Sequence, residues 1–326
     1  MKQSLFESRH QPQWQHFEQL LEKLERGRAK SADCQSFVQD YRRLCQHLAL
    51  AQERGYSSYL IDPLQQLVLR GHQQLYRQRT AIGANALEFL LAGFPRVVRQ
   101  EWRLVLIASL LFFISLLGIG VLVYLFPELI YSLVSQQQVT EMQSMYDPSA
   151  GRLGRAAERA SSEDWAMFGY YIMHNIGIAF QTFAGGLLFG LGSLFFLVFN
   201  GLIIGAIAGH LTQIGFGQTF WPFVIGHGAF ELSAIALSGA AGLKMGWALI
   251  APGRLPRGEA LLQAARVSVR LVYGVIVFLL IAAFVEAYWS SMTWPAPWIK
   301  YSVGAALWGL VLAYLTLAGR TPHAPE

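Results

Sequence analysis

Cysteine and charge are both scarce in this sequence of 326 residues. The two cysteines, Cys34 and Cys45, are too few for a disulfide framework or a four-cysteine zinc site. Charged residues make up only 14% of the chain and hydrophobic residues 54%, which excludes a disordered protein and disfavours an ordinary soluble domain. The net charge is +5. Because the basic residues lack the clustering of a nucleic-acid groove, we expect an anionic lipid surface as the partner and no binding of nucleic acid.

Catalytic motifs are absent as well. No Ser/His/Asp or Cys/His set, phosphate-binding loop or pair of acids stands at enzyme-like spacing. Residues 1–30 are polar and charged throughout, so a secretory signal peptide is not expected. The sequence therefore predicts a non-enzymatic protein without a cofactor.

Composition divides the chain into three parts. Residues 1–103 are polar, with apolar side chains at helical spacing, and predict a cytoplasmic helical bundle. This bundle is expected to end in an interfacial helix from about 86 to 103 that bends at Pro95, and Asp62 before Pro63 predicts one helix start. Residues 104–318 are membrane-like, and 319–326 form a short cytoplasmic tail.

Long apolar segments fill the membrane-like part. Four of them are each long enough to cross a bilayer as one helix, namely 104–126, 222–243, 271–289 and 301–318. Residues 168–212 are also apolar but, at about 1.5 Å per residue, too long for one span. We expect two spans there, with a turn at Gly190 and Gly192, and a re-entrant hairpin is the alternative. The predicted fold class is an all-α polytopic membrane bundle of about six transmembrane helices with the N-terminal cytoplasmic helical domain.

The distribution of basic residues predicts the orientation in the membrane. Arginines lie in 96–103, and lysine and arginine dominate 244–270, whereas the loop 127–167 is net acidic. Because basic loops remain in the cytoplasm, both termini are expected inside and the loop 127–167 outside.

Several polar side chains interrupt the apolar spans, where each needs a physical reason. His227 and Glu231 lie four residues apart and therefore on one face of a helix. Counting residues from the expected outer ends puts Asn175 and Glu286 at a similar depth. The candidate intramembrane cluster consists of His227, Glu231, Asn175, Glu286, His174 and Asn200.

Three roles remain open for this cluster. Its members can bond one another and hold the helices in register, they can form a proton- or substrate-coupled transport site, or His227 and Glu231 can hold a metal with a third ligand. A cavity that reaches the cluster from one side favours a pore or an enzyme, whereas a sealed cluster favours a scaffold.

Three glycines repeat every fourth residue on the expected third span, at Gly201, Gly205 and Gly209. Small residues at this spacing allow another helix backbone to approach closely. Packing within one chain is the favoured interpretation, and a homodimer seam is the alternative.

Several motifs together resemble the stage II sporulation protein M family in its longer form with a cytoplasmic helical domain. The segments that carry the resemblance are His227–Glu231 (HGAFE), Asn175, Asn200–Gly201, Ala282–Glu286 (AAFVE), Phe94–Arg99 (FPRVVR) and Gly71–Tyr76 (GHQQLY).

The resemblance implies a bacterial inner-membrane protein that acts as a non-enzymatic scaffold or anchor in the cell envelope. Sporulation members of the family anchor peptidoglycan-degrading partners, and longer members often stand beside genes for a MoxR-type AAA+ ATPase. Expected partners are therefore the lipid bilayer and either envelope-remodelling proteins or such an ATPase system. A transporter or channel that uses the polar cluster is the alternative function, and an intramembrane metal-dependent hydrolase is the third.

Overall fold

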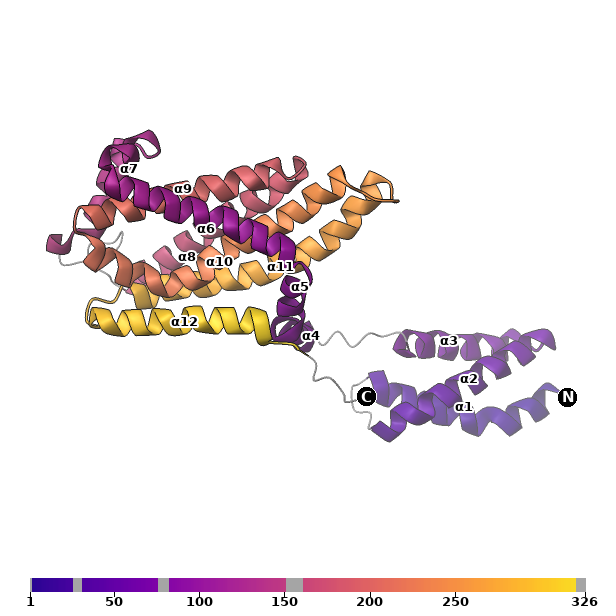
Figure 1. Cartoon of the computed structure of the whole chain (residues 1–326). Coiled ribbons are helices and arrows are strands. Elements are labelled where there is room, and N and C mark those ends of the chain that lie inside the picture. Colours follow the sequence, from indigo (N-terminus) through magenta and orange to yellow (C-terminus); the bar gives the residue numbers. More distant parts are fainter. Residues whose placement is uncertain (1, 26–30, 76–81, 151–160, 321–326) are drawn as a thin grey trace, which may run out of the picture. The chain divides into compact units, whose positions relative to one another are not determined.

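The chain folds as two compact helical units (Figure 1). The computed structural model describes residues 2–25, 31–75, 82–150 and 161–320. One unit comprises Met1–Ile82 and the other Gly83–Glu326. Neither unit contains a β-strand within the described ranges, which confirms the all-α prediction.

The first unit is a three-helix bundle of α1 (Gln3–Glu25), α2 (Ser31–Glu53) and α3 (Ser58–Leu75). Apolar side chains recur at helical spacing and form its core, in which Phe17 stacks on Phe37 with ring centroids 5.4 Å apart. The helix start predicted at Asp62 is wrong. The helix begins earlier, because the Ser57 carbonyl already accepts hydrogen bonds from the N–H groups of Leu60 and Ile61. Pro63 lies inside α3 and cannot donate the helical bond to the Tyr59 carbonyl, four residues earlier.

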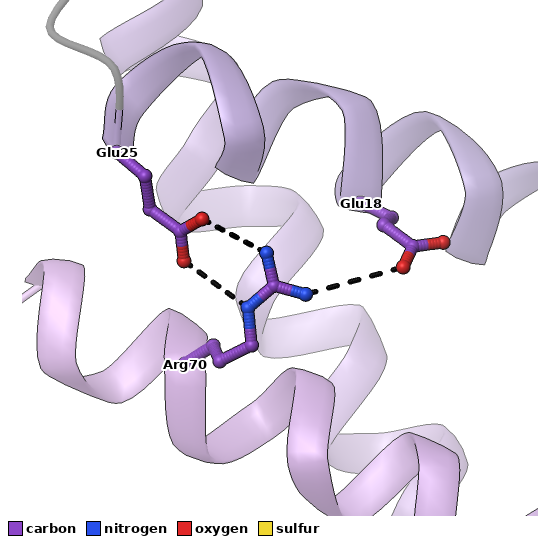
Figure 2. Close-up of polar contacts among 3 residues, drawn as sticks. All are labelled: Glu18, Glu25 and Arg70. Carbon is purple, nitrogen blue, oxygen red and sulfur yellow. Dashed lines mark hydrogen bonds and ion pairs between the residues drawn. The ribbon is translucent and has the colours of Figure 1, made fainter.

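Arg70 links α3 to α1 at the surface of the first unit (Figure 2). Its Nε and Nη2 donate to the two carboxylate oxygens of Glu25 at 3.1 and 2.9 Å, and Nη1 lies 3.9 Å from Glu18. The hydrogen bond to Glu25 raises the pKa of Arg70 above its usual value. Because the pair is exposed to solvent, it contributes no more than about 1 kcal/mol to stability.

Over residues 83–150 and 161–320, the second unit contains short helical pieces and six long helices. The pieces that precede the first long helix are α4 (Ile82–Glu88), the π-helical turn η1 (Phe89–Gly93) and α5 (Phe94–Gln100). The long helices are α6 (Trp102–Leu125), α8 (Ser161–Ala184), α9 (Leu191–Gln213), α10 (Gly217–Ile250), α11 (Arg257–Phe284) and α12 (Pro297–Leu317). The connections include η2 (Pro127–Ser132), α7 (Gln136–Tyr146), η3 (Pro148–Ala150), η4 (Gly185–Leu187) and the π-helical turn η5 (Val285–Ser290).

Five of the long helices are long and apolar enough to cross a membrane. They are α6, α9, α10, α11 with η5, and α12, and they correspond to five of the predicted spans. The remaining helix, α8, has 24 residues but is less apolar, because residues such as Tyr170, Asn175 and Gln181 interrupt it. Five of the predicted spans thus correspond to candidate membrane-crossing helices in the structure, and α8 as the sixth remains a prediction.

Helix α10 lies at the centre of the second unit and packs against α6, α8, α9, α11 and α12. In its apolar 18-residue stretch, 72% of the residues are buried, whereas the shares in α6 and α12 are 11% and 17%. A helix that is apolar on all sides belongs in the interior. The exposed apolar faces of α6 and α12 are suited to lipid.

A tight turn separates α8 from α9. Gly190 has a φ of +82°, a left-handed conformation that glycine adopts at little cost. The turn packs on the second half of α10, where a Cβ on Gly186 would lie 2.1 Å from the carbonyl oxygen of Gly242. Nearby on α10, Lys244 donates to Glu101 at 2.6 Å, directly before α6 begins. The hairpin therefore reaches the level at which α6 starts, which supports two spans within 168–212.

The segment before α6 packs into the second unit. Phe94 is fully buried, and a Cβ on Gly274 of α11 would lie 2.0 Å from its ring. Arg99 of α5 donates to the carbonyl oxygen of Leu315 in α12 at 3.0 Å. Residues 83–103 thus belong with the second unit, so the boundary that composition places at 103 lies at Ile82 in the structure.

The π-helical turn η1 lets the chain remain helical through Pro95. In η1 the Phe94 N–H bonds to the Phe89 carbonyl, five residues earlier. The next bond of this pattern would run to Leu90, but proline has no N–H to donate. The hydroxyl of Tyr314 in α12 donates to the Leu90 carbonyl instead, so this backbone group keeps a partner.

Candidate functional site

Helix α7 lies across one end of the second unit, where α9 ends and α10 begins (Figure 1). Ser135 and Gln138 form a capping box that starts the helix. Tyr146 packs its ring against Phe220 and Phe223 of α10, with centroids 5.2 and 5.6 Å apart. We call this end of the unit the α7 end.

A cavity of about 210 Å³ opens at the α7 end between α7, α8, α9, α10 and η5. Apolar side chains make up much of its lining, among them Met142, Met145 and Tyr146 of α7. Five of the six polar residues singled out in the sequence line this one cavity: His174, Asn175, His227, Glu231 and Glu286.

His227 is held in a defined orientation. It is 5% exposed, its ring packs edge-on against Phe223, and its Nδ1 lies 3.0 Å from the hydroxyl of Ser290. The opposite ring nitrogen, Nε2, lies 4.0 Å from Glu231 on the next turn of α10. Since Nδ1 faces a hydroxyl, the neutral tautomer that donates from Nδ1 leaves the Nε2 lone pair facing the carboxylate.

The π-helical turn η5 brings Glu286 to the same place. Ligand atoms of His227, Glu231 and Glu286 all lie within 4.8 Å of one another. The end of η5 is stabilised by Lys300 of α12, a buried lysine whose Nζ donates to the carbonyl oxygens of Ser290 and Met292 at 2.8 and 2.6 Å. Single π-turns of this kind often occur at functional sites.

Asn175 of α8 forms another wall of the cavity. It is 3% exposed and lies beside the Glu231 carboxylate. The geometry falls short of a full hydrogen bond, and the buried Nδ2 of Asn175 has no partner. An unsatisfied buried amide costs about 1–3 kcal/mol, which is a reason to expect a group in the cavity that bonds to it.

The other two predicted residues lie differently. His174 is exposed, stacks on Tyr170 with centroids 5.7 Å apart, and also lines the cavity. Asn200 does not line the cavity, because its Nδ2 donates to the Phe196 carbonyl on its own helix at 2.7 Å.

Ser290 and Lys300 were not singled out in the sequence, although both shape the site. Ser290 follows Glu286 by four residues, a spacing that places two side chains on one helical face. Lys300 is a single cation between the expected fifth and sixth spans. Both features are visible in the sequence. Neither shows, without the fold, that Ser290 contacts His227 or that Lys300 binds the end of η5.

The glycine strip of α9 packs within the chain. A Cβ on Gly201, Gly205 or Gly209 would lie 2.1 to 2.2 Å from α6 atoms, which are the Ser115 hydroxyl and the carbonyl oxygens of Leu116 and Gly120. This agrees with the favoured interpretation of the strip. Since α6 covers these glycines, they are not available as a homodimer seam.

Apart from His174, the cavity offers one imidazole nitrogen, two carboxylates and an amide, a set that can bind a cation or carry a proton. Ser290 contacts His227, but it is fully buried and does not line the cavity, so it is not placed as a nucleophile. The arrangement is that of a binding site in which Ser290 orients the histidine.

The sequence model of the stage II sporulation protein M family matches residues 109–291, more than half of the chain. The chain belongs to this family. The matched region contains every polar residue of the cavity. A domain of unknown function, DUF8413, matches residues 4–77 within the first unit. An uncharacterized protein of Methanocaldococcus jannaschii is 28% identical over 120 residues, which are 36% of this chain and 67% of that protein. No solved structure matches the chain significantly.

Proposed function

We propose that this membrane protein is a non-enzymatic anchor of the cell envelope, which recruits a soluble partner through its first unit. The observation that carries the proposal is the independence of that unit, which has its own aromatic core and its own match to a domain model. The second unit then serves as the membrane anchor. The basic residues of 96–103 and 244–270 support a cytoplasmic location for both termini in a bacterial inner membrane.

The family membership supports envelope remodelling as the process. With the first unit in the cytoplasm, a MoxR-type AAA+ ATPase system is the partner class that we favour for it. Peptidoglycan-remodelling proteins would instead meet the α7 end outside. Within the first unit, Gln3 of α1 bonds to Ser57 before α3 at 2.8 Å, so the starts of these helices lie together. Leu5 and Tyr59 follow there and are 59% and 86% exposed, which makes them candidate contacts.

The test compares the full chain with a chain that begins at Gly83, each expressed in its native host under its own promoter. We expect the shortened chain to insert in the membrane but to lose both the crosslinked cytoplasmic partner and complementation of the deletion strain. The double variant Leu5→Ser with Tyr59→Ser should weaken recruitment, whereas Leu69→Ser, at a residue 58% exposed in the same unit, should not. Equal crosslinking by the full and shortened chains would contradict the proposal.

A transporter or channel is the second candidate, and the cavity favours it. A purely structural polar cluster needs no open volume, whereas about 210 Å³ of space reaches Glu231 from the α7 end. The variant Glu231→Gln keeps the shape of the side chain but removes its charge. If it folds and complements fully, charge-dependent transport is excluded. If it folds and fails to complement, a purely structural role of the cluster is excluded.

A further inference from the structure

We propose that His227, Glu231 and Glu286 bind one divalent transition-metal cation at the α7 end of the second unit, with Asn175 as a supporting ligand. The family assignment names no metal for this chain. The three ligand groups come from α10 and η5, and their ligand atoms lie within 4.8 Å of one another.

The charge of the cavity favours a cation. The Glu231 carboxylate faces a space with an apolar surround, where a charge without compensation is costly. Among the residues that the structure describes, no lysine or arginine lines the cavity. A divalent cation held by the three ligand groups would supply positive charge beside Glu231 while His227 remains neutral.

The orientation of His227 is that of a metal ligand. Metal-bound histidines commonly donate their second ring N–H to an oxygen, which fixes the ring and its tautomer. In this chain Ser290 Oγ lies 3.0 Å from Nδ1. The free nitrogen is Nε2, which lies on the side of Glu231.

Asn175 supplies independent support. Its buried Nδ2 has no hydrogen-bond partner, and the side chain lines the cavity. The Nδ2 group can donate to a metal-bound water, and an amide turned by 180° offers Oδ1 as a further ligand. Either arrangement would satisfy a group that is unsatisfied in the chain alone.

The ligand chemistry indicates which metals fit. One nitrogen and two carboxylate oxygens without a thiolate suit Zn²⁺ and similar first-row ions, and Zn²⁺ binds more tightly than Mn²⁺ or Fe²⁺ in most such sites. Zinc ligands at about 2.0–2.2 Å stand roughly 3.4 Å apart in a tetrahedral site. The distance of 4.0 Å between His227 Nε2 and Glu231 Oε2 thus closes by small side-chain rotations.

The experiment uses the full chain, without an affinity tag, in nanodiscs. The protein is stripped with EDTA, dialysed and titrated with Zn²⁺ against a chelating dye, and bound zinc is counted by mass spectrometry of the metal. Glu231→Gln and Glu286→Gln remove one ligand each, and Ser290→Ala removes only the partner of Nδ1. Glu259→Gln is the matched control, at an exposed glutamate of α11.

We expect about one Zn²⁺ per wild-type chain. The glutamine variants should lose stoichiometric binding, Ser290→Ala should bind roughly 10–100-fold more weakly, and Glu259→Gln should match the wild type. Zinc should raise the melting temperature of the wild type and of Glu259→Gln fully, that of Ser290→Ala less at the same zinc concentration, and that of the glutamine variants not at all. Equal affinity in the wild type and in folded glutamine variants would overturn the assignment.

Two measurements on the wild type keep the proposal testable if the variants do not fold. X-ray absorption of the zinc protein should show a shell of nitrogen and oxygen with one imidazole, and a sulfur ligand or several imidazoles would refute the site. Infrared spectroscopy of the metal-free and zinc-treated chain tests the competing arrangement, in which Glu231 and Glu286 share a proton. A protonated carboxyl band that persists with excess zinc, without bound metal, would overturn the proposal. Because neither measurement involves a partner, failure here leaves the anchor proposal standing.

Discussion

Replacement of Gly205 by alanine tests directly how α6 and α9 are held together. A Cβ at Gly205 would lie 2.1 Å from the carbonyl oxygen of Leu116 and 2.7 Å from the Ile119 side chain. Carbon and carbonyl oxygen atoms approach to about 3.3 Å in ordinary close contacts. Alanine therefore requires the two helices to separate by roughly 1 Å at this point.

The energetic cost follows from the length of the contact. Gly201 and Gly209 also touch the α6 backbone, so a local separation loosens several close contacts at once. Overpacking of this kind costs about 1–3 kcal/mol, and alanine recovers about 0.5–1 kcal/mol by its better helix propensity. We expect Gly205→Ala to lower the free energy of unfolding by up to about 2.5 kcal/mol.

The matched control is Gly118→Ala on α6, where a Cβ would meet no atom within 4 Å. This variant gains helix propensity without a clash and should be neutral or slightly more stable than the wild type. Reversible unfolding of all three proteins is followed by circular dichroism in one mixed micelle as the fraction of SDS rises. Equal stability of Gly205→Ala and Gly118→Ala would refute the close packing of α6 on α9.

Three further predictions concern other parts of the chain. Burial, and then the nearby charges of His10 and Arg43, lower the pKa of His47, whose Nδ1 accepts a hydrogen bond from Trp14. Because the unfolded state therefore binds the proton more tightly, the first unit should keep its stability above about pH 6.5 and lose stability below it. We expect faster hydrogen exchange in α1 and α2 at pH 5.5, after correction for intrinsic rates, and unchanged protection would contradict this. Tyr314→Phe leaves the Leu90 carbonyl without its donor and should cost about 1–3 kcal/mol in the same SDS titration, and no loss would show that this bond does not matter. With both native cysteines replaced by serine, a cysteine at Ser144 should react with an impermeant thiol reagent in intact cells and one at Gly258 should not, whereas the reverse pattern would invert the topology.

The helical fold could be predicted because a membrane permits few alternatives. Every backbone group must bond within its own segment, and bilayer thickness sets the span length. The first unit followed from helical spacing of apolar residues in the same way. The packing of Phe94 against Gly274 could not be predicted, since it joins residues far apart in sequence. Its consequence, the transfer of 83–103 to the second unit, depends on that contact.

Most of the candidate site was accessible from the sequence for a related reason. Spans cross the membrane side by side, so counting residues from their ends predicts which polar groups lie at one depth, and Asn175, Glu231 and Glu286 share the cavity. Depth does not tell which way a side chain faces. Asn200 turns back to its own helix for this reason. The π-helical turn that positions Glu286 is bonded at its end by Lys300 of another helix. No local sequence pattern predicts this turn.

The contact of Phe94 with Gly274, and the bond from Tyr314 to Leu90, set an order of events during synthesis. Phe94 and Tyr314 are 220 residues apart in the chain. At about 5–20 residues per second, the ribosome needs roughly 10–40 s to pass from one to the other. During that interval the first unit can already fold. The residues of α5 that α11 and α12 later bury are still exposed at this stage. The second unit closes only when the last helix arrives, so nascent chains that stop before α12 should be substrates for membrane quality control.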